Sequence, residues 1–281
     1  MIIFHHAAVL KKYAHKLEDS WQESGFVPTM GALHNGHLSL IKTAQKRSRV
    51  TIASIFVNPS QFNDPEDFKK YPNTIAADIR MLEEAGCDIL FLPDVVEMYP
   101  NGWHHTKPYN LGSLETLLEG FYRPGHFQGV CQIVQRLLEI VEPGNLFMGQ
   151  KDFQQCMVVQ RLIALKNLPV QLYTCPTLRE ADGLAMSSRN MRLSKEERSI
   201  APAIYREIQL IKQDLNNMPL RALEVRTGKN LLDAGFTSID YVSIATPATL
   251  QPLEKWEKDI STVILVAAYI GKVRLIDNIL I

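Results

Sequence analysis

The sequence predicts an α/β protein in which a Rossmann-like, doubly wound parallel sheet precedes a small C-terminal α+β domain. Strand and helix patterns alternate through the first 176 residues, as they do in doubly wound sheets. The strand patterns are continuous apolar runs, which is typical of a sheet covered on both faces. Beyond residue 176 two helical patterns precede strand-like runs, as in an α+β unit. We therefore expect domains at 1–176 and 177–281.

The elements expected in the first domain alternate in type, and each has a local signal. Strands are rich in β-branched and apolar residues, and helices repeat an apolar stripe with helical spacing. Gly86 can end one helix and Pro93 one strand. In chain order we expect a strand at 25–27, a helix from Asn35, a strand at 49–57, a helix at 74–85, a strand at 87–92, a helix at 128–141, a strand at 145–148, a helix at 152–166 and a strand at 170–173.

The second domain begins with a long charged pattern. We expect one helix over 194–217, with four isoleucines for packing, and a second over 220–234. Strand-like runs follow at 241–244 and 263–268, and the segment 274–278 closes the chain.

Composition excludes several classes of protein. The chain has 281 residues, 46% of them hydrophobic, and Lys plus Arg equals Asp plus Glu at 30 each. There is no global basic footprint, so we expect no nucleic-acid partner. No apolar run reaches about 20 residues, so we expect no membrane span. The N-terminus does not read as a signal peptide, and four cysteines without a C-x-x-C pair indicate buried free thiols in a reducing cytoplasm.

The segment 28–37 carries the most information about function. It places His34 and His37 three residues apart, at the expected start of a helix. Backbone N–H groups and the helix dipole favour anions there, and a phosphate is the natural anion. Gly31 and Gly36 lack Cβ atoms and allow close approach of a nucleotide. The His-Asn-Gly-His core resembles the HIGH signature of nucleotidyltransferases, although two such histidines are also compatible with a zinc site or an ordinary surface.

Three further polar blocks also lie beyond expected strands or at the domain boundary. Asn58 and Gln61 are neutral hydrogen-bonding groups, or else parts of an Asn-Pro turn. Lys151 offers a positive charge for a phosphate, Asp152 a cap or a ribose contact, and Gln155 lies one helical turn beyond Lys151. The alternative is a capped helix with an exposed lysine.

The last block covers 179–192 and contains an Ala-Met-Ser-Ser-Arg run. Ser187 and Ser188 supply hydroxyl and backbone donors, and Arg189 supplies a charged fork for a phosphate. The run resembles the KMSKS loop that accompanies HIGH motifs. The alternative reading is a polar interdomain linker.

Together these blocks resemble the pantoate–β-alanine ligase family. The matching segments run in the family's order and span almost the whole chain: 28–37, 57–62, 123–127, 151–155, 182–190 and 266–278. The resemblance implies a Rossmann-like nucleotidyltransferase domain with a C-terminal lid, and a homodimer in the cytoplasm. It implies that the carboxylate of pantoate attacks the α-phosphate of ATP, giving pantoyl adenylate and pyrophosphate. β-Alanine then displaces AMP to give pantothenate.

The resemblance also implies roles for individual residues. His37 stands at the position usually assigned as proton donor, and His34, Lys151, Ser187 and Arg189 are the other expected catalytic groups. Gln61 and Gln155 match the pantoate-binding glutamines, and Gln61 also borders the β-alanine site. The expected ATP-binding residues are Met30, Gly31, Ala32, Leu33, His34, Asn35, Gly36, His37, Gly149, Gln150, Lys151, Asp152, Leu178, Met186, Ser187, Ser188 and Arg189.

The chain departs from the family's pattern at three positions. The family often has Met or Leu at the position of Ser60 and Glu at that of Gln150, and commonly Val at that of Leu178. Magnesium is expected as the cofactor, bound through nucleotide phosphates, and the sequence names no protein ligand for it. Two alternatives stay open. Another nucleotidyltransferase would share the nucleotide blocks without needing both glutamines, and a non-catalytic nucleotide-binding regulator would not need His37 or Lys151.

Overall fold

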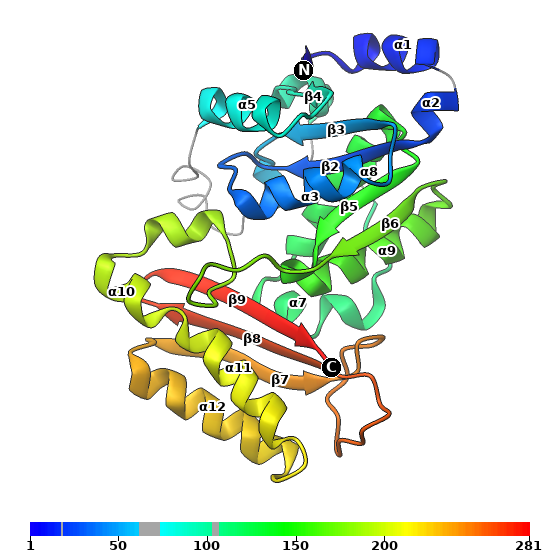
Figure 1. The fold of residues 1–281 in the computed structure, drawn as a ribbon. Helices are drawn as coiled ribbons and strands as arrows, with labels where there is room; N and C mark the ends of the chain where they lie inside the picture. The colour runs from blue at the N-terminus through cyan, green and yellow to red at the C-terminus, as the bar shows by residue number, and fades with distance from the viewer. Residues whose placement is uncertain (18, 62–73, 103–106) are drawn as a thin grey trace. The chain divides into compact units, whose positions relative to one another are not determined.

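The computed structural model describes residues 1–17, 19–61, 74–102 and 107–281 (Figure 1). The chain forms two compact units. Unit 1 contains Met1–Gln150 and Gln154–Pro176, and unit 2 contains Lys151–Phe153 and Thr177–Ile281. The sequence places residues 151–153 with the first domain, whereas their contacts group them with the second unit.

Unit 1 is built on six parallel strands in the order β1-β4-β3-β2-β5-β6. The predicted doubly wound sheet is therefore confirmed. The strand β1 was not expected, because three residues at a sheet edge give no readable pattern. The strands are β1 (Ile2–Phe4), β2 (Ser24–Thr29), β3 (Val50–Ile55), β4 (Ile89–Phe91), β5 (Asn145–Gly149) and β6 (Gln171–Cys175).

Helices cover both faces of this sheet (Figure 1). Alternate strand residues show why: Phe26 and Ile52 enter one apolar core, and their neighbours Val27 and Ala53 enter another. The helices are α1 (Ala7–Leu17), α2 (Asp19–Gln22), α3 (Asn35–Gln45), α5 (Ile75–Glu84), α6 (Val95–Met98), α7 (Glu119–Tyr122), α8 (His126–Val141) and α9 (Phe153–Lys166), with 3-10 turns η1 (Pro59–Gln61), η2 (Gly112–Glu115) and η3 (Gln150–Asp152).

The strand order reverses at β2, which has β3 on one side and β5 on the other. From β2 the chain continues to β3 and β4 on one side, and later to β5 and β6 on the other. Ligands of open α/β sheets bind beyond the carboxyl ends of the strands at such a switch point. The segment that starts at Met30 follows β2, and Gln150 follows β5. Two of the predicted nucleotide segments therefore begin at the switch point.

Unit 2 contains an antiparallel sheet in the order β7-β8-β9, formed by Ser238–Ala245, Val263–Ile270 and Val273–Leu280. A separate apolar core joins this sheet to its helices, with Ile208, Leu223 and Ile264 fully buried. The helices of unit 2 are α10 (Lys195–Ile200), α11 (Ala203–Asp214) and α12 (Leu220–Ala234), preceded by the 3-10 turn η4 (Ser188–Arg192). The predicted α+β character of this part is confirmed.

The prediction of a single helix over 194–217 is wrong, because the chain forms α10 and α11 instead. Pro202 lies between them with φ −62°. Proline lacks the N–H that would continue the ladder, and its ring clashes with the preceding turn, so it starts a new helix well but interrupts an existing one. Ser194 starts α10 in a capping box with Glu197.

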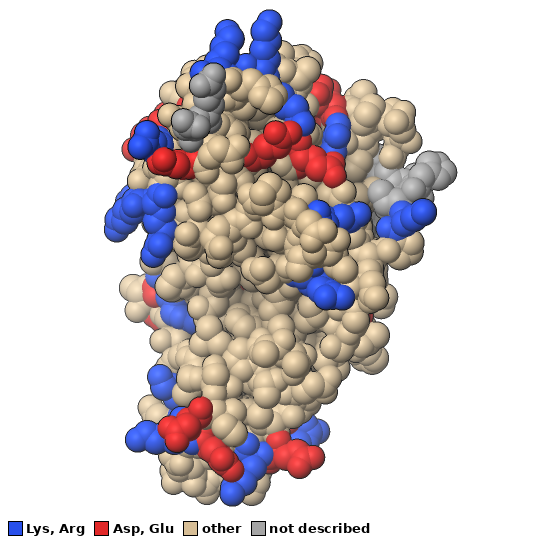
Figure 2. Space-filling model, turned by 90° about the vertical axis from the view of Figure 1, so that its right-hand side faces the viewer, with Lys and Arg blue, Asp and Glu red and all other residues tan. Residues whose placement is uncertain are grey.

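The charged side chains are mixed in sign. On the face shown in Figure 2, Lys and Arg occur in separate groups near Asp and Glu, in keeping with a formal net charge of zero. All four cysteines are buried thiols, as the sequence predicts. Within the described ranges, no helix has the length and hydropathy to span a membrane.

Candidate active site

The segment 34–37 starts α3 with an unusual pair of caps. His34 is the N-cap residue, and its Nδ1 accepts a hydrogen bond from the Gly36 N–H at 3.1 Å. His37 reaches back, so that its Nδ1 accepts from the His34 N–H at 3.4 Å. The two ring centroids lie 4.1 Å apart. Since both Nδ1 atoms accept, each neutral ring carries its proton on Nε2, the nitrogen directed away from its cap.

These caps change how the helix start can bind an anion. The N–H of Gly36 is bonded to His34, and the N–H of His37 is bonded to the carbonyl of His34 at 2.8 Å. The expectation that backbone donors of the first turn are open is therefore wrong for these two residues. The backbone of this first turn therefore offers a phosphate fewer donors than the sequence predicts. Among residues whose placement is described, no group of three His, Cys, Asp or Glu supports the zinc alternative.

A buried carboxylate holds the loop before the histidines. Asp78 of α5 is 2% exposed and accepts from the N–H groups of Ala32 at 3.0 Å and Leu33 at 2.8 Å. The Thr74 hydroxyl donates to the same carboxylate at 3.0 Å. Two loop N–H groups are thus used inside the protein, so Ala32 and Leu33 support the loop's shape through their backbone.

Gly31 fits the same arrangement. Its φ is +80°, and a Cβ there would lie 3.0 Å from the Asp78 carboxylate and 3.1 Å from an Ile55 methyl group. The backbone and the packing therefore both favour glycine here, whether or not a nucleotide approaches. Met30, His34 and His37 are half-buried, and Asn35 is exposed.

Asp78 was missed by the sequence reasoning, although a signal was present. It lies three residues after Ile75 and four before Leu82, on the apolar stripe of the predicted helix. A carboxylate on the buried face of a helix needs donors, and here the 31–33 loop supplies two of them.

Asn58, which follows β3, has a structural role. Asn58 is 1% exposed; its amide donates to the Gly129 carbonyl, and its Oδ1 accepts from the Tyr99 hydroxyl at 2.8 Å. Burial raises the pKa of Tyr99 to about 12, which keeps that phenol a donor. The turn reading is correct for the backbone, since 59–61 form η1. The side chain of Gln61 lies outside the described residues.

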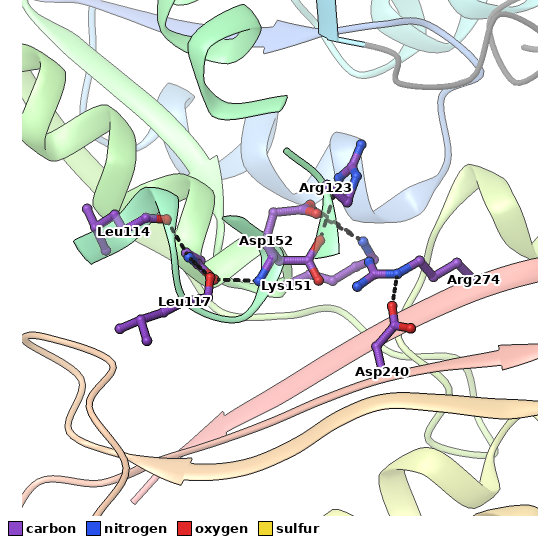
Figure 3. Close-up of polar contacts among 9 residues, drawn as sticks. Leu114, Leu117, Arg123, Lys151, Asp152, Asp240 and Arg274 are labelled. Atoms are coloured by element: carbon purple, nitrogen blue, oxygen red, sulfur yellow. Dashed lines mark hydrogen bonds and ion pairs between the residues drawn. The ribbon is translucent and has the colours of Figure 1, made fainter. Parts of the chain in front are cut away.

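The two glutamines after β5 are used differently. Gln154 is 2% exposed, donates to the carbonyls of Leu114 and Leu117 and accepts from the Glu119 N–H at 3.0 Å. The two carbonyl partners are labelled in Figure 3. Gln155 is half-buried and is the one of the pair that the sequence assigned to substrate.

The prediction that Gln155 lies one helical turn beyond Lys151 is wrong. The α-helix α9 begins at Phe153, and Lys151 lies in the preceding 3-10 turn η3. The rule that residues four apart share a face therefore does not apply to this pair. Gly149 is the last residue of β5, and Gln150 begins the 3-10 turn.

Unit 2 contains a small cavity with three cationic side chains in its lining. Lys151, Arg189 and Arg274 line it together with Ser187 and Asn190. The Lys151 Nζ lies 3.4 Å from Asp152, and the Arg274 Nε lies 2.7 Å from Asp240, as Figure 3 shows. Two carboxylates thus balance part of the charge that the three cationic side chains bring to the lining. The structure therefore brings the predicted Lys151, Ser187 and Arg189 together. Arg274 was not predicted.

The 179–192 segment is an ordered turn and not a loose linker. Arg179 and Ala185 form an isolated antiparallel bridge, and the Met186 N–H donates to the Leu178 carbonyl at 3.0 Å. Ser187 then caps η4, its hydroxyl accepting from the Arg189 N–H at 3.3 Å. Ser188 begins that turn and is half-buried like Met186, whereas Leu178 is 39% exposed.

A family model described as pantoate-beta-alanine ligase matches residues 2–280. The pantothenate synthetase of Cytophaga hutchinsonii is 45% identical over 262 residues, which cover 92% of this chain and 91% of the relative. That of Pseudomonas fluorescens is 47% identical over 259 residues, 91% of this chain and 89% of the relative.

Solved structures agree over almost the full length. Pantothenate synthetase from Thermus thermophilus superposes with a TM-score of 0.90 at 41% identity, covering 99% of both chains. Pantoate-beta-alanine ligase from Francisella tularensis, complexed with beta-gamma ATP and beta-alanine, gives 0.83 at 38% identity, covering 100% of this chain and 97% of that one. The resemblance seen in the sequence is thereby confirmed: this chain belongs to the pantoate–β-alanine ligase family.

Proposed function

We propose that this chain joins pantoate to β-alanine through a pantoyl-adenylate intermediate, releasing pyrophosphate and then AMP. Membership of the family makes it an ATP-dependent ligase that forms the amide bond of pantothenate. The observation that carries the mechanism is the histidine pair at the switch point of the sheet, where His34 and His37 start α3 with their ring centroids 4.1 Å apart. An adenylation step concentrates negative charge on the α- and β-phosphates, and preorganised donors stabilise it.

We assign the phosphates of ATP to two sets of residues. The first is the 30–37 segment, in which Asp78 fixes the backbone and the histidine rings donate. The second is the cavity of unit 2, where Lys151, Ser187 and Arg189 converge. Gly149, Gln150, Asp152, Leu178, Met186 and Ser188 complete the proposed nucleotide contacts. His37 is the proposed proton donor, and residues 177–281 are the proposed lid.

Pantoate is assigned to Gln61 and Gln155, and the β-alanine site borders Gln61. Neutral amides suit this task, because a carboxylate paired with a strong cation would be a poorer nucleophile. The use of Gln154 in holding the 114–119 segment leaves Gln155 as the glutamine of that pair for the acid.

Magnesium is proposed to enter with ATP. Among residues that the structure describes, no three acidic, histidine or cysteine side chains gather as a metal set. Magnesium commonly keeps waters and binds phosphate oxygens instead. We also propose a homodimer in the cytoplasm, as the family resemblance implies.

Oxygen transfer tests the adenylate directly. Pantoate labelled with ¹⁸O in its carboxylate is incubated with ATP, magnesium and β-alanine, and the nucleotide product is analysed by mass spectrometry. An adenylate leaves one carboxylate oxygen on the phosphate of AMP when the amine displaces it. We therefore expect labelled AMP and unlabelled pyrophosphate. Formation of ADP with labelled inorganic phosphate would show an acyl phosphate instead and overturn the proposal.

The same assay addresses the other nucleotidyltransferase reading. Such an enzyme retains the nucleotidyl group in its final product, so no AMP would be released when β-alanine is added. Release of AMP only when both pantoate and β-alanine are present supports the ligase.

A further inference from the structure

The 266–278 tail is a matching segment to which the proposed chemistry gives no role. It forms most of β8 and β9, and its last two residues are polar and almost completely buried. Asp277 is 2% exposed and Asn278 is 3% exposed. Consecutive strand residues project to opposite faces, so the two side chains serve different neighbours. Burial of polar groups is costly unless each finds a partner, and both do.

Asp277 binds the start of the 179–192 segment. Its two carboxylate oxygens accept from Arg179, at 2.6 Å from Nη1 and 2.9 Å from Nη2. The same guanidinium donates to the Gly183 carbonyl at 3.1 Å and lies 3.8 Å from the centre of the Tyr205 ring. A bidentate pair of this kind fixes direction as well as distance. The turn that leads into Ser187 is thus bound to the end of β9.

Asn278 binds the segment that carries the lysine. Its side-chain amide donates to the Lys151 carbonyl at 2.9 Å. The backbone carbonyl of Asn278 accepts from Arg179 at 3.3 Å. Two neighbouring residues of β9 therefore hold both chain segments that line the cavity, one through Arg179 and one through the lysine's backbone.

We propose that Asp277 and Asn278 are positioning residues for adenylation: they hold the backbone of Lys151 in register with the Ser187–Arg189 turn, so that the cations converge on the phosphates. The proposal rests on the assigned role of Lys151 in binding ATP. Asn278 gives the sharper test of the two residues, because its side chain bonds directly to the Lys151 backbone and not through the 179–192 segment. Loss of this bond frees the turn that carries the ammonium group without removing any charge from the cavity.

The test starts with Asn278→Ala. A misplacement of about 1 Å costs roughly a hundredfold in rate when geometry is preorganised, so we expect single-turnover adenylation to fall by about 10- to 100-fold. The KM for pantoate should stay unchanged, since no proposed acid contact is removed. The matched control is Asn230→Ala, which removes a partly buried amide bond of 3.0 Å to Glu207 between α11 and α12 of the same unit. The control should adenylate as the wild type does.

A double-mutant cycle with Lys151→Ala makes the test specific. Lys151→Ala should lose about 10²–10³ in rate, the scale for one preorganised donor. If Asn278 acts through that lysine, the double variant should be no slower than Lys151→Ala alone. Multiplicative losses would overturn the proposal, as would a normal rate for Asn278→Ala beside an impaired Lys151→Ala.

If the assigned role of Lys151 in binding ATP is wrong, the variants give a different result. A normal rate for Lys151→Ala would remove the lysine from the mechanism, and the positioning role would fall with it. Thermal melts identify variants that do not fold; Asn278→Leu, which is close in volume, uncharged and lacks the donor, then replaces Asn278→Ala. If both fail to fold, Asn278 is a folding residue and the proposal is contradicted.

Discussion

At the scale of single residues, adjacent side chains of one type can have unrelated tasks. Gln154 and Gln155 are indistinguishable by composition, and only the fold shows that Gln154 fills its hydrogen-bonding capacity with the backbone of residues 114–119. The sequence assigned His34, His37, Lys151, Ser187 and Arg189 to the candidate site, because those residue types are chemically distinctive. It missed Asp78 and Asn278, whose partners are backbone groups distant in sequence.

This difference between the glutamines gives a prediction. Loss of one hydrogen bond with its partner left unsatisfied costs about 1–3 kcal/mol, so Gln155→Ala should weaken pantoate use by roughly 5- to 150-fold. The affinity for ATP should stay within about threefold. Gln154→Ala should instead lower the thermal midpoint of unfolding. Separate titrations of pantoate and ATP, with thermal melts, check both variants; a Gln155→Ala enzyme with normal pantoate use and weakened ATP binding would reverse our assignment.

At the scale of elements, the sequence predicted type and order better than boundaries. The helix at 220–234 and the strands of the parallel sheet other than β1 were found because they carry readable apolar patterns. The break at Pro202 was missed because the isoleucine stripe continues through it. The start of α9 at Phe153 was missed because a 3-10 turn leaves no distinct pattern in composition.

The turn before Ser187 gives a prediction about pH. A hydrogen bond from Arg198, at 2.6 Å, is the main cause that lowers the pKa of Asp182. A depressed carboxyl pKa stabilises the folded state above the unfolded pKa, and this contribution is lost as the pH falls through the folded value. Asp182→Asn should therefore be less stable than the wild type at neutral pH, by about 0.2–1 kcal/mol because the pair is partly exposed.

The difference between Asp182→Asn and the wild type should vanish in strong acid, where the wild-type carboxyl is also neutral. Urea unfolding across the acid range measures it. Asp259→Asn, at an exposed position of the same unit, is the charge-matched control. A gap that persists unchanged at the acid end would mean that Asp182 acts through its shape and not its charge.

At the scale of the whole molecule, two apolar cores belong to unit 1 and a third belongs to unit 2. From the change in pattern, the sequence predicted a domain boundary near residue 176. It did not predict that Lys151–Phe153 would group with the second unit, since that depends on contacts with β9 and the 186–189 turn. Tertiary contacts of this kind leave no periodic signal.

The buried thiols give a prediction for the whole chain. Burial raises the pKa values of Cys87 and Cys131 to about 12 from the ordinary thiol value of 9.0. Each pKa unit is a tenfold change, so the thiolate population near pH 8 falls about a thousandfold. Pulse alkylation followed by mass spectrometry should label these thiols slowly in the native protein and rapidly in urea. Fast labelling of either residue in fully active protein would show that its core opens readily.

The histidine caps of α3 affect how any substitution at residue 34 must be read. Alanine there removes a ring donor and an N-cap together, and loss of an N-cap alone costs about 0.5–2 kcal/mol. In an alanine scan, the loss of rate at residue 34 would therefore be assigned to catalysis, although part of it comes from a destabilised helix start. Asparagine separates the two contributions, because its side-chain oxygen caps well but offers no imidazole. The ratio between the His34→Ala and His34→Asn rates thus measures how much of the apparent catalytic effect is the architecture of one helix start.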